Sequence, residues 1–444
     1  MIRRLSALAV CLLATTAVAQ TPAPTNPPIP VVPTNPDYTA LQEGKPVDSR
    51  VNENKDDHPL YPEQTRAPYH KTAPYKLTEI TGGLQAPWAL AFLPDGKFLV
   101  TERVPGALRV VDAHGAISAP VAGVTGLAAG WPMTGLFDLA LDPKFNINHR
   151  IFFTFFGWDH GMISGIQVAR ATFNQAANSL SDVKVIFQAR PQTPNDSRSG
   201  VGTRSGGRLA IGKDGFLYVT IGDRDSGSSF PWRVAQTLDT HLGKIVRITQ
   251  DGKAAPGNPF TGPKNQQEGA LPEIWATGQR SQEGLAFDND GNLWETEHGP
   301  RGGDEINLIR KGGNYGWPLT SHGIDYPGPP MGNGAVAMPG VEQPLYYWAP
   351  SMGPSQIAFY KGNLFPEWKN SVFVAMLRGN ALERLTLSGG KVVDEEPLLT
   401  EVKTRLRDVR VGPDGAVYVL TDSGLSSITD NTPATSKLLK LTPQ

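Results

Sequence analysis

The sequence predicts an all-β fold, a six-bladed β-propeller built of four-stranded antiparallel blades. One short phrase, in which two apolar strands flank a turn, recurs six times along the chain. Its copies begin at residues 90, 139, 209, 285, 357 and 409, and this spacing of 49 to 76 residues fits four strands and their loops. No segment shows the long helical periodicity of a βαβ unit. A stacked β-sandwich is the structural alternative.

The six copies of the phrase justify one hairpin in each predicted blade. They read LAFLPDGKFLVTER (90–103), LALDPKFNINHRIFFTF (139–155), LAIGKDGFLYVTIGD (209–223), LAFDNDGNLWETEHG (285–299), IAFYKGNLFPEWKNSVFVAML (357–377) and VRVGPDGAVYVLTDS (409–423). Asp-Gly between β-rich runs is a strong hairpin signal. The segments between copies, at 156–208, 224–284 and 299–356, exceed what hairpins need. Long loops on a rigid scaffold commonly form a binding site.

The composition excludes several classes of protein. The 444 residues include 41 Lys and Arg against 42 Asp and Glu, so no basic excess points to nucleic acid. The 48 Gly and 39 Pro are spread along the chain without a period, which excludes collagen and favours a turn-rich globular protein.

Residues 1–19 have the pattern of a secretory signal peptide. A basic start is followed by an apolar stretch at 5–18, and Ala17-Val18-Ala19 resembles a cleavage site. We therefore expect a periplasmic or secreted protein. The one cysteine, Cys11, lies in this segment, so the mature protein would have neither a disulfide nor a thiol. A lipid anchor at Cys11 is the alternative.

Residues 20–60 are predicted as a Pro-rich linker or arm, and residues 61–444 as the propeller domain. The stretch 21–36 holds seven prolines, which is typical of a polyproline-like or disordered spacer. Residues 37–75 stay polar and rich in Pro and Tyr, so we expect either an extended arm lying on the domain or disorder.

The densest polar segment is a candidate calcium site. It reads EHGPRGGDEIN at 297–307 and is followed by KGGNYGWP at 311–318. Gly299-Pro300 forces a turn that can leave backbone carbonyls pointing outward, and Asp304 and Glu305 supply hard oxygen ligands. Calcium (Ca²⁺) takes six to eight oxygens, often with backbone carbonyls among them. A solvated turn with two surface carboxylates is the alternative.

Three arginines lie near predicted strand starts. They are Arg280 in GQRSQEGLAFD and Arg405 and Arg407 in TRLRDVRVGPDG. Side chains two residues apart on a strand face the same side, so Arg405 and Arg407 are predicted to act together. Two guanidinium groups on one face suit an anionic ligand with several carboxylates, and surface salt bridges are the alternative.

The phrases together resemble the soluble pyrroloquinoline quinone (PQQ)-dependent sugar dehydrogenases, the glucose/sorbosone and aldose sugar dehydrogenase family. The resemblance spans about residues 60 to 442 and is carried by GLQAPWALAFLPDGKFLVTER, GGRLAIGKDGFLYVTIGD, HLGKIVRI, EHGPRGGDEINLIRKGGNYGWP and RLRDVRVGPDG. PEQTRAPY at 62–69 resembles the family's N-terminal arm. The stretch EHGP…GGDEINLI…GGNYGWP is the most specific part. The family is a six-bladed propeller.

The resemblance implies bound PQQ, with Ca²⁺ bridging the cofactor and the protein. It implies that the carbonyls of Gly299 and Pro300 ligate this Ca²⁺, and that Glu305 and Tyr315 help to hold a second, structural Ca²⁺. Further residues are implied in cofactor binding: Arg280, Arg405 and Arg407 at its carboxylates and quinone oxygens, and Trp348, in YYWAPS, as a lid residue.

Four polar positions around the cofactor depart from the family. The family's catalytic base is a His four residues before the Arg of its GGRL segment, and here that position is Arg204. A guanidinium stays protonated and cannot act as a base. A family Lys near the quinone aligns with Arg378, a family Gln aligns near Met133, and the Asn after the cofactor arginine is Ser281.

In the family, a base removes the C1 hydroxyl proton of an aldose while hydride passes to the quinone. The cofactor performs the redox chemistry and the protein positions and polarises it. Candidate replacement bases are His298, beside the predicted Ca²⁺ site, and His160 and Asp196. His298 has the best location of the three, and Arg280 is the second residue assigned to the catalytic set. His241, in THLGKIVRI, is expected to be structural.

Three functions remain open from the sequence. The first is PQQ- and Ca²⁺-dependent oxidation of a sugar or related alcohol at C1 to the lactone. The second is a non-catalytic propeller that binds carbohydrate or a partner, for which Arg204 is the main argument. The third is a Ca²⁺-dependent lactonase. Fold alone does not select among them, but three arginines suited to a cofactor favour the first. The electron acceptor is unknown, and the resemblance is compatible with a homodimer.

Serine-hydrolase and zinc chemistry are not expected. No G-x-S-x-G elbow stands between a strand and a helix, and the eight His residues include no H-x-x-x-H pair.

Overall fold

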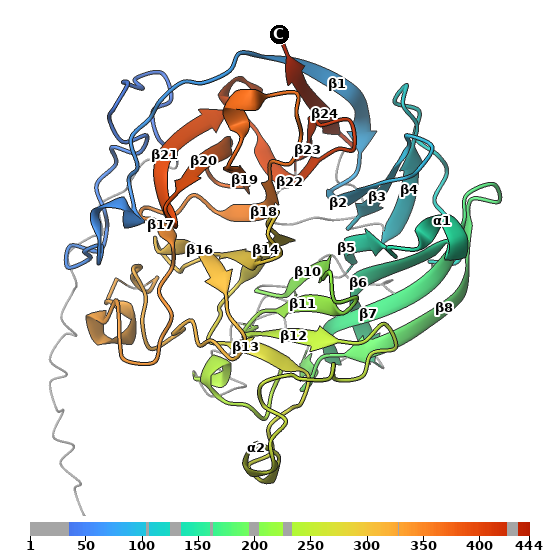
Figure 1. The fold of residues 1–444 in the computed structure, drawn as a ribbon, viewed down its shortest axis with the longest axis horizontal. Coiled ribbons are helices and arrows are strands. Elements are labelled where there is room, and N and C mark those ends of the chain that lie inside the picture. Colours follow the sequence, from blue (N-terminus) through green and yellow to red (C-terminus); the bar gives the residue numbers. More distant parts are fainter. Residues whose placement is uncertain are drawn as a thin grey trace, which may run out of the picture. The chain divides into compact units, whose positions relative to one another are not determined.

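The protein folds as a six-bladed β-propeller, as predicted, with its sheets arranged around a central axis (Figure 1). The structure, a computed structural model, describes residues 35–103, 106–124, 135–159, 163–194, 204–224, 233–326, 328–423 and 434–444. All of these belong to one compact unit, Val32–Gln444.

Each sheet forms one blade, and the strands run outward from the axis in sequence order. Blade 1 contains β2 (Pro87–Phe92), β3 (Phe98–Glu102) and β4 (Ala107–Val111). Blade 2 contains β5 (Leu136–Leu141), β6 (Arg150–Asp159), β7 (Ile163–Asn174) and β8 (Ser179–Gln188), with β9 (Thr193–Pro194) beside β7. Blade 3 contains β10 (Gly206–Ile211), β11 (Leu217–Ile221), β12 (Lys244–Ile248) and β13 (Ile274–Thr277).

The remaining three blades repeat this order. Blade 4 contains β14 (Gln282–Phe287), β15 (Leu293–Glu297), β16 (Asp304–Ile309) and β17 (Tyr346–Trp348). Blade 5 contains β18 (Pro354–Phe359), β19 (Ser371–Met376), β20 (Leu382–Ser388) and β21 (Lys391–Leu398). Blade 6 contains β22 (Arg405–Val411), β23 (Val417–Asp422), β24 (Ser436–Pro443) and, outermost, β1 (Tyr75–Leu84). In blade 1 a single bridge from Val111 to Ile117 stands beyond β4, where the other blades have a fourth strand.

Helical structure in the described residues is limited to short pieces. They are α1 (Phe145–Asn148), α2 (Pro263–Gln267) and the 3-10 turns η1 (Pro62–Gln64), η2 (Val234–Gln236), η3 (Met331–Gly334), η4 (Pro366–Trp368) and η5 (Thr400–Val402). Within the described ranges, no helix has the length and apolar character that crossing a membrane requires.

Blade 6 closes the ring by joining strands from the two ends of the propeller. Strand β1 pairs antiparallel with β24, with Tyr75 opposite Pro443 and Leu84 opposite Ser436. The four-stranded sheet is therefore completed by the first strand of the propeller rather than by a strand of its own repeat.

The Asp-Gly sequences form the predicted inner hairpin turns. Between β2 and β3, Gly96 has a φ of +84°, and the Lys97 amide donates to Asp95 Oδ1 at 3.3 Å. Glycine adopts a positive φ without steric penalty, which explains its place in the turn. The equivalent glycines also have a positive φ: Gly215, Gly291 and Gly415.

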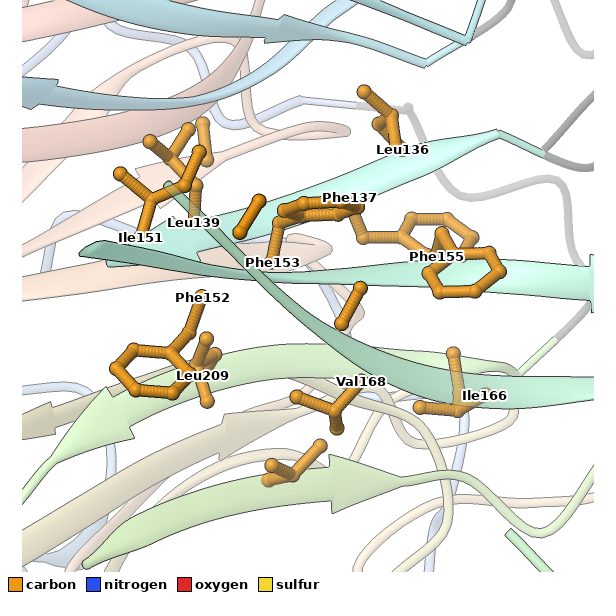
Figure 2. Close-up of a cluster of buried hydrophobic side chains, with 14 of the residues drawn as sticks. Leu136, Phe137, Leu139, Ile151, Phe152, Phe153, Phe155, Ile166, Val168 and Leu209 are labelled. Atoms are coloured by element: carbon orange, nitrogen blue, oxygen red, sulfur yellow. The ribbon is translucent and has the colours of Figure 1, made fainter. Parts of the chain in front are cut away.

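The core lies between neighbouring blades, because each sheet is covered on both faces. Strand β6 carries the apolar run IFFTFF, and all six of these residues are buried. Figure 2 shows Phe152 directed toward Leu209 of β10, while Phe153 and Phe155 lie on the side of Phe137. The alternation of side chains along one strand thus supplies apolar groups to both of its faces.

A buried charge network lies at the axis, defined here as the axial network: Asp138, Arg208, Asp408 and Arg410. Arg208 Nη1 donates to Asp408 Oδ1 at 2.9 Å, and Arg410 bonds Asp408 Oδ2 at 3.0 Å and Asp138 Oδ1 at 2.7 Å. The carboxylates also accept backbone amides, from Leu90 to Asp408 and from Leu209 to Asp138. Burial lowers the pKa of Arg208 to about 10, while the two aspartates act in the opposite direction.

The side chain of Arg208, on blade 3, contacts each of the other five blades. It lies 3.8 Å from the ring centre of Trp88 in blade 1 and 3.9 Å from Asp138 in blade 2. Its guanidinium donates to Glu283 O in blade 4, Ser355 Oγ in blade 5 and Arg407 O in blade 6. A single fully buried side chain therefore ties the inner strands together.

Residues 35–74 form an arm that packs against blades 4 and 5 before β1 begins. Tyr61 OH donates to Leu345 O at 2.7 Å, Arg66 Nη2 donates to Ala349 O at 2.9 Å, and Tyr38 OH donates to Gly379 O at 2.9 Å. His322, in the loop after β16, shares a hydrogen bond of 2.7 Å with Asp57 of the arm.

Candidate functional site

The predicted arginines meet at one end of the axis because of how the blades are built. The innermost strands all run in the same direction along the axis, so their first residues lie at one face. Arg204 precedes β10, Arg280 precedes β14 and Arg405 begins β22. The ends of second strands return to the same face, which brings Arg103 after β3 and Asp223 after β11 into the same region.

The turn after β15 is held rigidly by one carboxylate. Asp304 Oδ1 accepts the amide of Gly299 at 2.9 Å, and Oδ2 accepts Ser351 Oγ and the amides of Met352 and Gly353, each at 2.7 Å. A Cβ at Gly299 would lie 2.1 Å from Gly302 O, so only glycine fits here. Both oxygens of Asp304, a predicted Ca²⁺ ligand, are thus engaged by protein donors.

Arg280 is the most buried cation of the site, with 3% exposure. Its Nη1 donates to the carbonyls of His298 and Gly299, both at 2.8 Å, and its Nη2 donates to Tyr326 OH at 3.3 Å. Its Nε is buried and has no hydrogen-bond partner among the described residues. Burial, reinforced by the nearby Arg204, lowers the pKa of Arg280.

A small acidic cavity lies behind this turn. It is lined by Arg280, Glu297, His298, Gly299, Gly303, Glu305, Tyr315, Trp317, Thr320 and Ser321. Glu297 and Glu305 face each other across β15 and β16. Burial raises the pKa of Glu305 to about 7, and burial together with the Glu305 charge raises that of Glu297 well above its usual value. Two carboxylates that resist ionisation suggest that a cation is needed to stabilise their charged form.

The phenol of Tyr315 is held by two backbone groups of the same segment. It donates to Leu308 O at 2.7 Å and accepts the amide of Arg310 at 2.8 Å. The carbonyl is therefore the one ligand that Tyr315 could offer beside Glu305. Among the described residues no three or more His, Cys, Asp or Glu side chains are grouped to hold a metal ion. The predicted Ca²⁺ sites also use backbone carbonyls, and a group of side chains alone does not include these ligands.

Arg405 and Arg407 face the same side, as their two-residue spacing predicts. Both approach Asp422 Oδ2, Arg405 Nε at 3.7 Å and Arg407 Nη2 at 2.8 Å. Arg407 also binds Glu283 at 3.2 Å, whereas the Arg405 side chain is 40% exposed. Burial alone would raise the pKa of Asp422, but Arg407 and Arg405 outweigh it and lower this pKa to about 2.

Arg103 joins this cluster and was missed by the sequence analysis. Burial lowers its pKa to about 10, and the neighbouring Arg407 acts in the same direction. The side chain lies at the end of β3, in the phrase FLVTER, where nothing in the sequence marks it as different from a surface arginine.

Arg204 lies against Asp223 and Trp317, two further residues that sequence reasoning did not single out. Its Nη1 is 3.2 Å from Asp223 Oδ2, and its guanidinium carbon is 5.9 Å from the Trp317 ring centre. Trp317 Nε1 donates to Asp223 Oδ2 at 2.7 Å, and the guanidinium carbon of Arg280 lies 5.1 Å from the same ring. The tryptophan thus links the two arginines.

The other predicted residues lie around this centre in different roles. His298 Nε2 contacts Pro354 O at 2.8 Å, which leaves Nδ1 as the ring nitrogen able to accept a proton. Ser281 is buried directly after Arg280, and its carbonyl accepts the amide of His298. Arg378 is exposed and packs by its backbone against Gly353. His241 hydrogen-bonds the amide of Arg190, which fits a structural role.

The structure places Trp348, the expected lid residue, against Glu395 of blade 5. Its side chain is 3% exposed, its Nε1 donates to Glu395 Oε1 at 2.8 Å, and its ring packs edge-on against Tyr346. The carbonyl of Trp348 accepts the amide of Gly303 at 2.9 Å. Three further residues named from the sequence lie outside the described ranges: Met133, His160 and Asp196.

The comparisons with known proteins agree with this architecture. A family described as glucose/sorbosone dehydrogenase matches residues 84–429. Aldose sugar dehydrogenase YliI of Escherichia coli is 36% identical over 364 residues, covering 81% of this chain and 91% of that protein. Quinoprotein glucose dehydrogenase B of Acinetobacter calcoaceticus is 27% identical over 443 residues, with 83% and 89% covered.

Solved structures give the same result. The apo form of the soluble aldose sugar dehydrogenase from Escherichia coli is 35% identical with a TM-score of 0.74, covering 84% of this chain and 100% of that one. A PQQ-bound aldose sugar dehydrogenase from Streptomyces coelicolor is 27% identical with a TM-score of 0.66, with the same coverage. From the family match over most of the propeller and the similarity along nearly the full length of these relatives, the chain belongs to the glucose/sorbosone dehydrogenase family.

Proposed function

We propose that this chain is a PQQ- and Ca²⁺-dependent dehydrogenase that oxidises an aldose sugar or a related alcohol at C1 to the lactone. The observation that carries the proposal is Arg280. Its guanidinium is buried, has no carboxylate partner in the described structure and keeps an unused Nε donor. A desolvated cation left in this state favours binding of an anionic, planar ligand with several carboxylates.

The donor set fits both implied groups. Arg280, Arg405 and Arg407 supply cations for the carboxylates of PQQ, with Ser281 and Arg378 beside them. The Gly299 carbonyl accepts Arg280 and retains a second lone pair, so with the carbonyl of Pro300 it can ligate Ca²⁺. Glu305 and the carbonyl of Tyr315 suit a second Ca²⁺, whose charge would favour the ionised carboxylates against the burial that raises the pKa of Glu305 and Glu297.

When bound, PQQ supplies a quinone that accepts a hydride from C1 of the sugar. The chain's own part is to hold the cofactor and the metal and to polarise the cofactor. Asp304 fixes the carbonyl turn, so those oxygens need no rearrangement on binding. Arg280 and Arg405 orient anionic groups, and Arg407 is already paired with Asp422 and Glu283.

The test begins with protein purified without metal or cofactor. PQQ is titrated by calorimetry with and without Ca²⁺, and the loaded protein is given a panel of aldoses with an artificial dye acceptor. We expect Ca²⁺-dependent PQQ binding and dye reduction by at least one sugar. Failure to bind PQQ under both conditions would overturn the proposal.

A second candidate function is a propeller that binds a sugar without oxidising it. Arg204 favours it, because at the family's base position it forms an ion pair with Asp223. Ca²⁺-dependent PQQ binding with no turnover of any aldose would select this second function. We further propose export to the periplasm or the medium after cleavage behind Ala19, which N-terminal sequencing of the mature protein would test.

A further inference from the structure

Position 204, which aligns with the catalytic base of the family, holds an arginine, a hydrogen-bond donor, instead of a proton acceptor. Arg204 presents only N–H groups, so it cannot remove a hydroxyl proton. The group that Arg204 contacts is a carboxylate, and Asp223 Oδ2 lies 3.2 Å from Arg204 Nη1. A base is therefore present next to the altered position, although the altered residue itself is not one.

Asp223 is held at the centre of the site. Its amide donates to the carbonyl of Arg280 at 2.9 Å, and its Oδ2 accepts Trp317 Nε1 at 2.7 Å. The residue is 3% exposed. Backbone and side chain are thus both fixed relative to the arginine that the proposed function assigns to the cofactor.

Four other described acidic side chains of the site each have partners of their own. Asp304 accepts four hydrogen bonds, one from the amide of Gly299 and three from residues 351–353. Asp422 is bound by Arg407 and approached by Arg405, and Glu283 pairs with Arg407. Glu297 accepts the amide of Arg280 inside the acidic cavity. Asp223 is the carboxylate among them that contacts the residue at the altered position.

We infer that Asp223 is the catalytic base of this chain and that Arg204 is a positioning residue that orients its carboxylate. The inference rests on the proposed function. The C1 hydroxyl proton passes to Asp223, the C1–H bond breaks with its electron pair going to the quinone cofactor, and the C1–O bond becomes the carbonyl of the lactone. The sugar is oxidised and the quinone is reduced by two electrons.

Arg204 has a physical reason to stand beside such a base. As the hydroxyl loses its proton, negative charge develops on the sugar oxygen. The guanidinium carbons of Arg204 and Arg280 lie 5.9 Å and 5.1 Å from the Trp317 ring centre, and both cations can stabilise this charge. A histidine base would provide the proton acceptor but not the second fixed cation.

The first test removes the base while keeping its shape. Asp223→Asn retains an oxygen for Trp317 Nε1, so the site should stay folded and should bind PQQ with unchanged affinity by calorimetry. Loss of a general base lowers kcat by roughly 10²- to 10⁴-fold. Asp214→Asn is the matched control, since Asp214 pairs with Arg247 at the opposite end of blade 3. A kcat for Asp223→Asn within threefold of this control would overturn the inference.

The second test restores the family's residue. Imidazoles lose their proton roughly two to three pH units above carboxylic acids. In the double variant Arg204→His with Asp223→Asn, we expect turnover to return in part, with the acid limb of the pH profile moved upward relative to wild type. An unmoved acid limb would count against Asp223 as the wild-type base. A loss of turnover in His298→Asn but not in Asp223→Asn would assign the base to His298.

The experiments distinguish a failure of the proposed function from a failure of the inference about Asp223. If wild type binds no PQQ, the proposed function and the inference fall together. If wild type binds PQQ but turns over a sugar only after Arg204→His, the family chemistry stands and the inference about Asp223 is overturned. Turnover in wild type that Asp223→Asn removes without changing PQQ affinity supports both.

Discussion

Two groups of buried charges lie along one axis and behave differently. In the axial network, Asp138 and Asp408 balance Arg208 and Arg410, and every carboxylate accepts several donors. In the site above it, Arg280 binds carbonyls and a phenol instead of a carboxylate. The axial network is a closed set, because its cations and carboxylates are paired with one another, and it stabilises the fold. The site around Arg280 is an incomplete set, because this cation has no carboxylate partner in the described structure and can still bind a ligand.

Removing one member of the closed set should have the largest effect on stability. Arg208→Met keeps much of the volume but takes one cation from Asp408 and removes the contacts to five blades. Breaking a buried ion pair costs about 3–5 kcal/mol. We expect the free energy of unfolding in urea to fall by that amount. A loss below about 1 kcal/mol would show that the blades hold together without this network.

The acidic cavity should make the metal-free protein less stable as pH rises. Burial raises the pKa of Glu305 to about 7, from 4.5 in the unfolded chain. The folded state therefore keeps a proton that the unfolded state has lost, so this stabilisation is full below about pH 4.5 and disappears toward pH 7. It amounts to about 3 kcal/mol at most.

Urea melts of apo protein between pH 4.5 and 8 measure this slope. Glu305→Gln should flatten it, and added Ca²⁺ should reverse it, because the metal favours the ionised carboxylate. Glu395 serves as an internal reference: its pKa is also raised by burial to about 7, but it lies beside Tyr346 and Trp348 rather than in the cavity. Glu395→Gln should leave the response to Ca²⁺ intact.

Removing the charge of Arg280 from the incomplete set should lower PQQ affinity more than it lowers the free energy of unfolding. Arg280→Gln removes a charge that has no carboxylate partner in the described structure, so the free energy of unfolding should change by less than about 1 kcal/mol. Charged hydrogen bonds contribute roughly 1.5–3 kcal/mol, which corresponds to a fall in PQQ affinity of about 10- to 150-fold. Calorimetry with Arg247→Gln as control measures this. Equal affinity in both variants would remove Arg280 from the cofactor site.

The smallest effect is expected where an ion pair belongs to neither set. Lys97 and Asp95 lie 2.6 Å apart on the β2–β3 turn, and both side chains are about two-fifths exposed. Lys97→Ala should shift the urea midpoint by an amount equivalent to less than about 0.5 kcal/mol, and the shift should shrink with salt. A larger loss would mean that exposed pairs also contribute to holding the blades.

The sequence could predict the propeller because its signals are local and repeated. Each inner hairpin carries its own apolar alternation and turn, and glycines such as Gly96 mark the turn directly. The shared direction of Arg405 and Arg407 followed from strand geometry for the same reason. These inferences need only a few neighbouring residues.

The site was less predictable because its contacts join distant segments. Asp223 meets Arg204 and Trp317 only when blade 3 and the loop after β16 are in place. The sequence also could not show that the amides of Met352 and Gly353 donate to Asp304. A three-residue strand such as β17 gives no pattern that says which way the Trp348 side chain faces.

The pairing of Tyr75 with Pro443 joins two strands that are synthesised at different times. Strand β1 leaves the ribosome before the other strands of the propeller, and its partner β24 leaves last. Until then β1 has an open hydrogen-bonding edge, which is the kind of edge that pairs with foreign strands. A ribosome that stops after β1 but before residue 436 releases a chain whose ring cannot close, so each such product carries β1 without its partner.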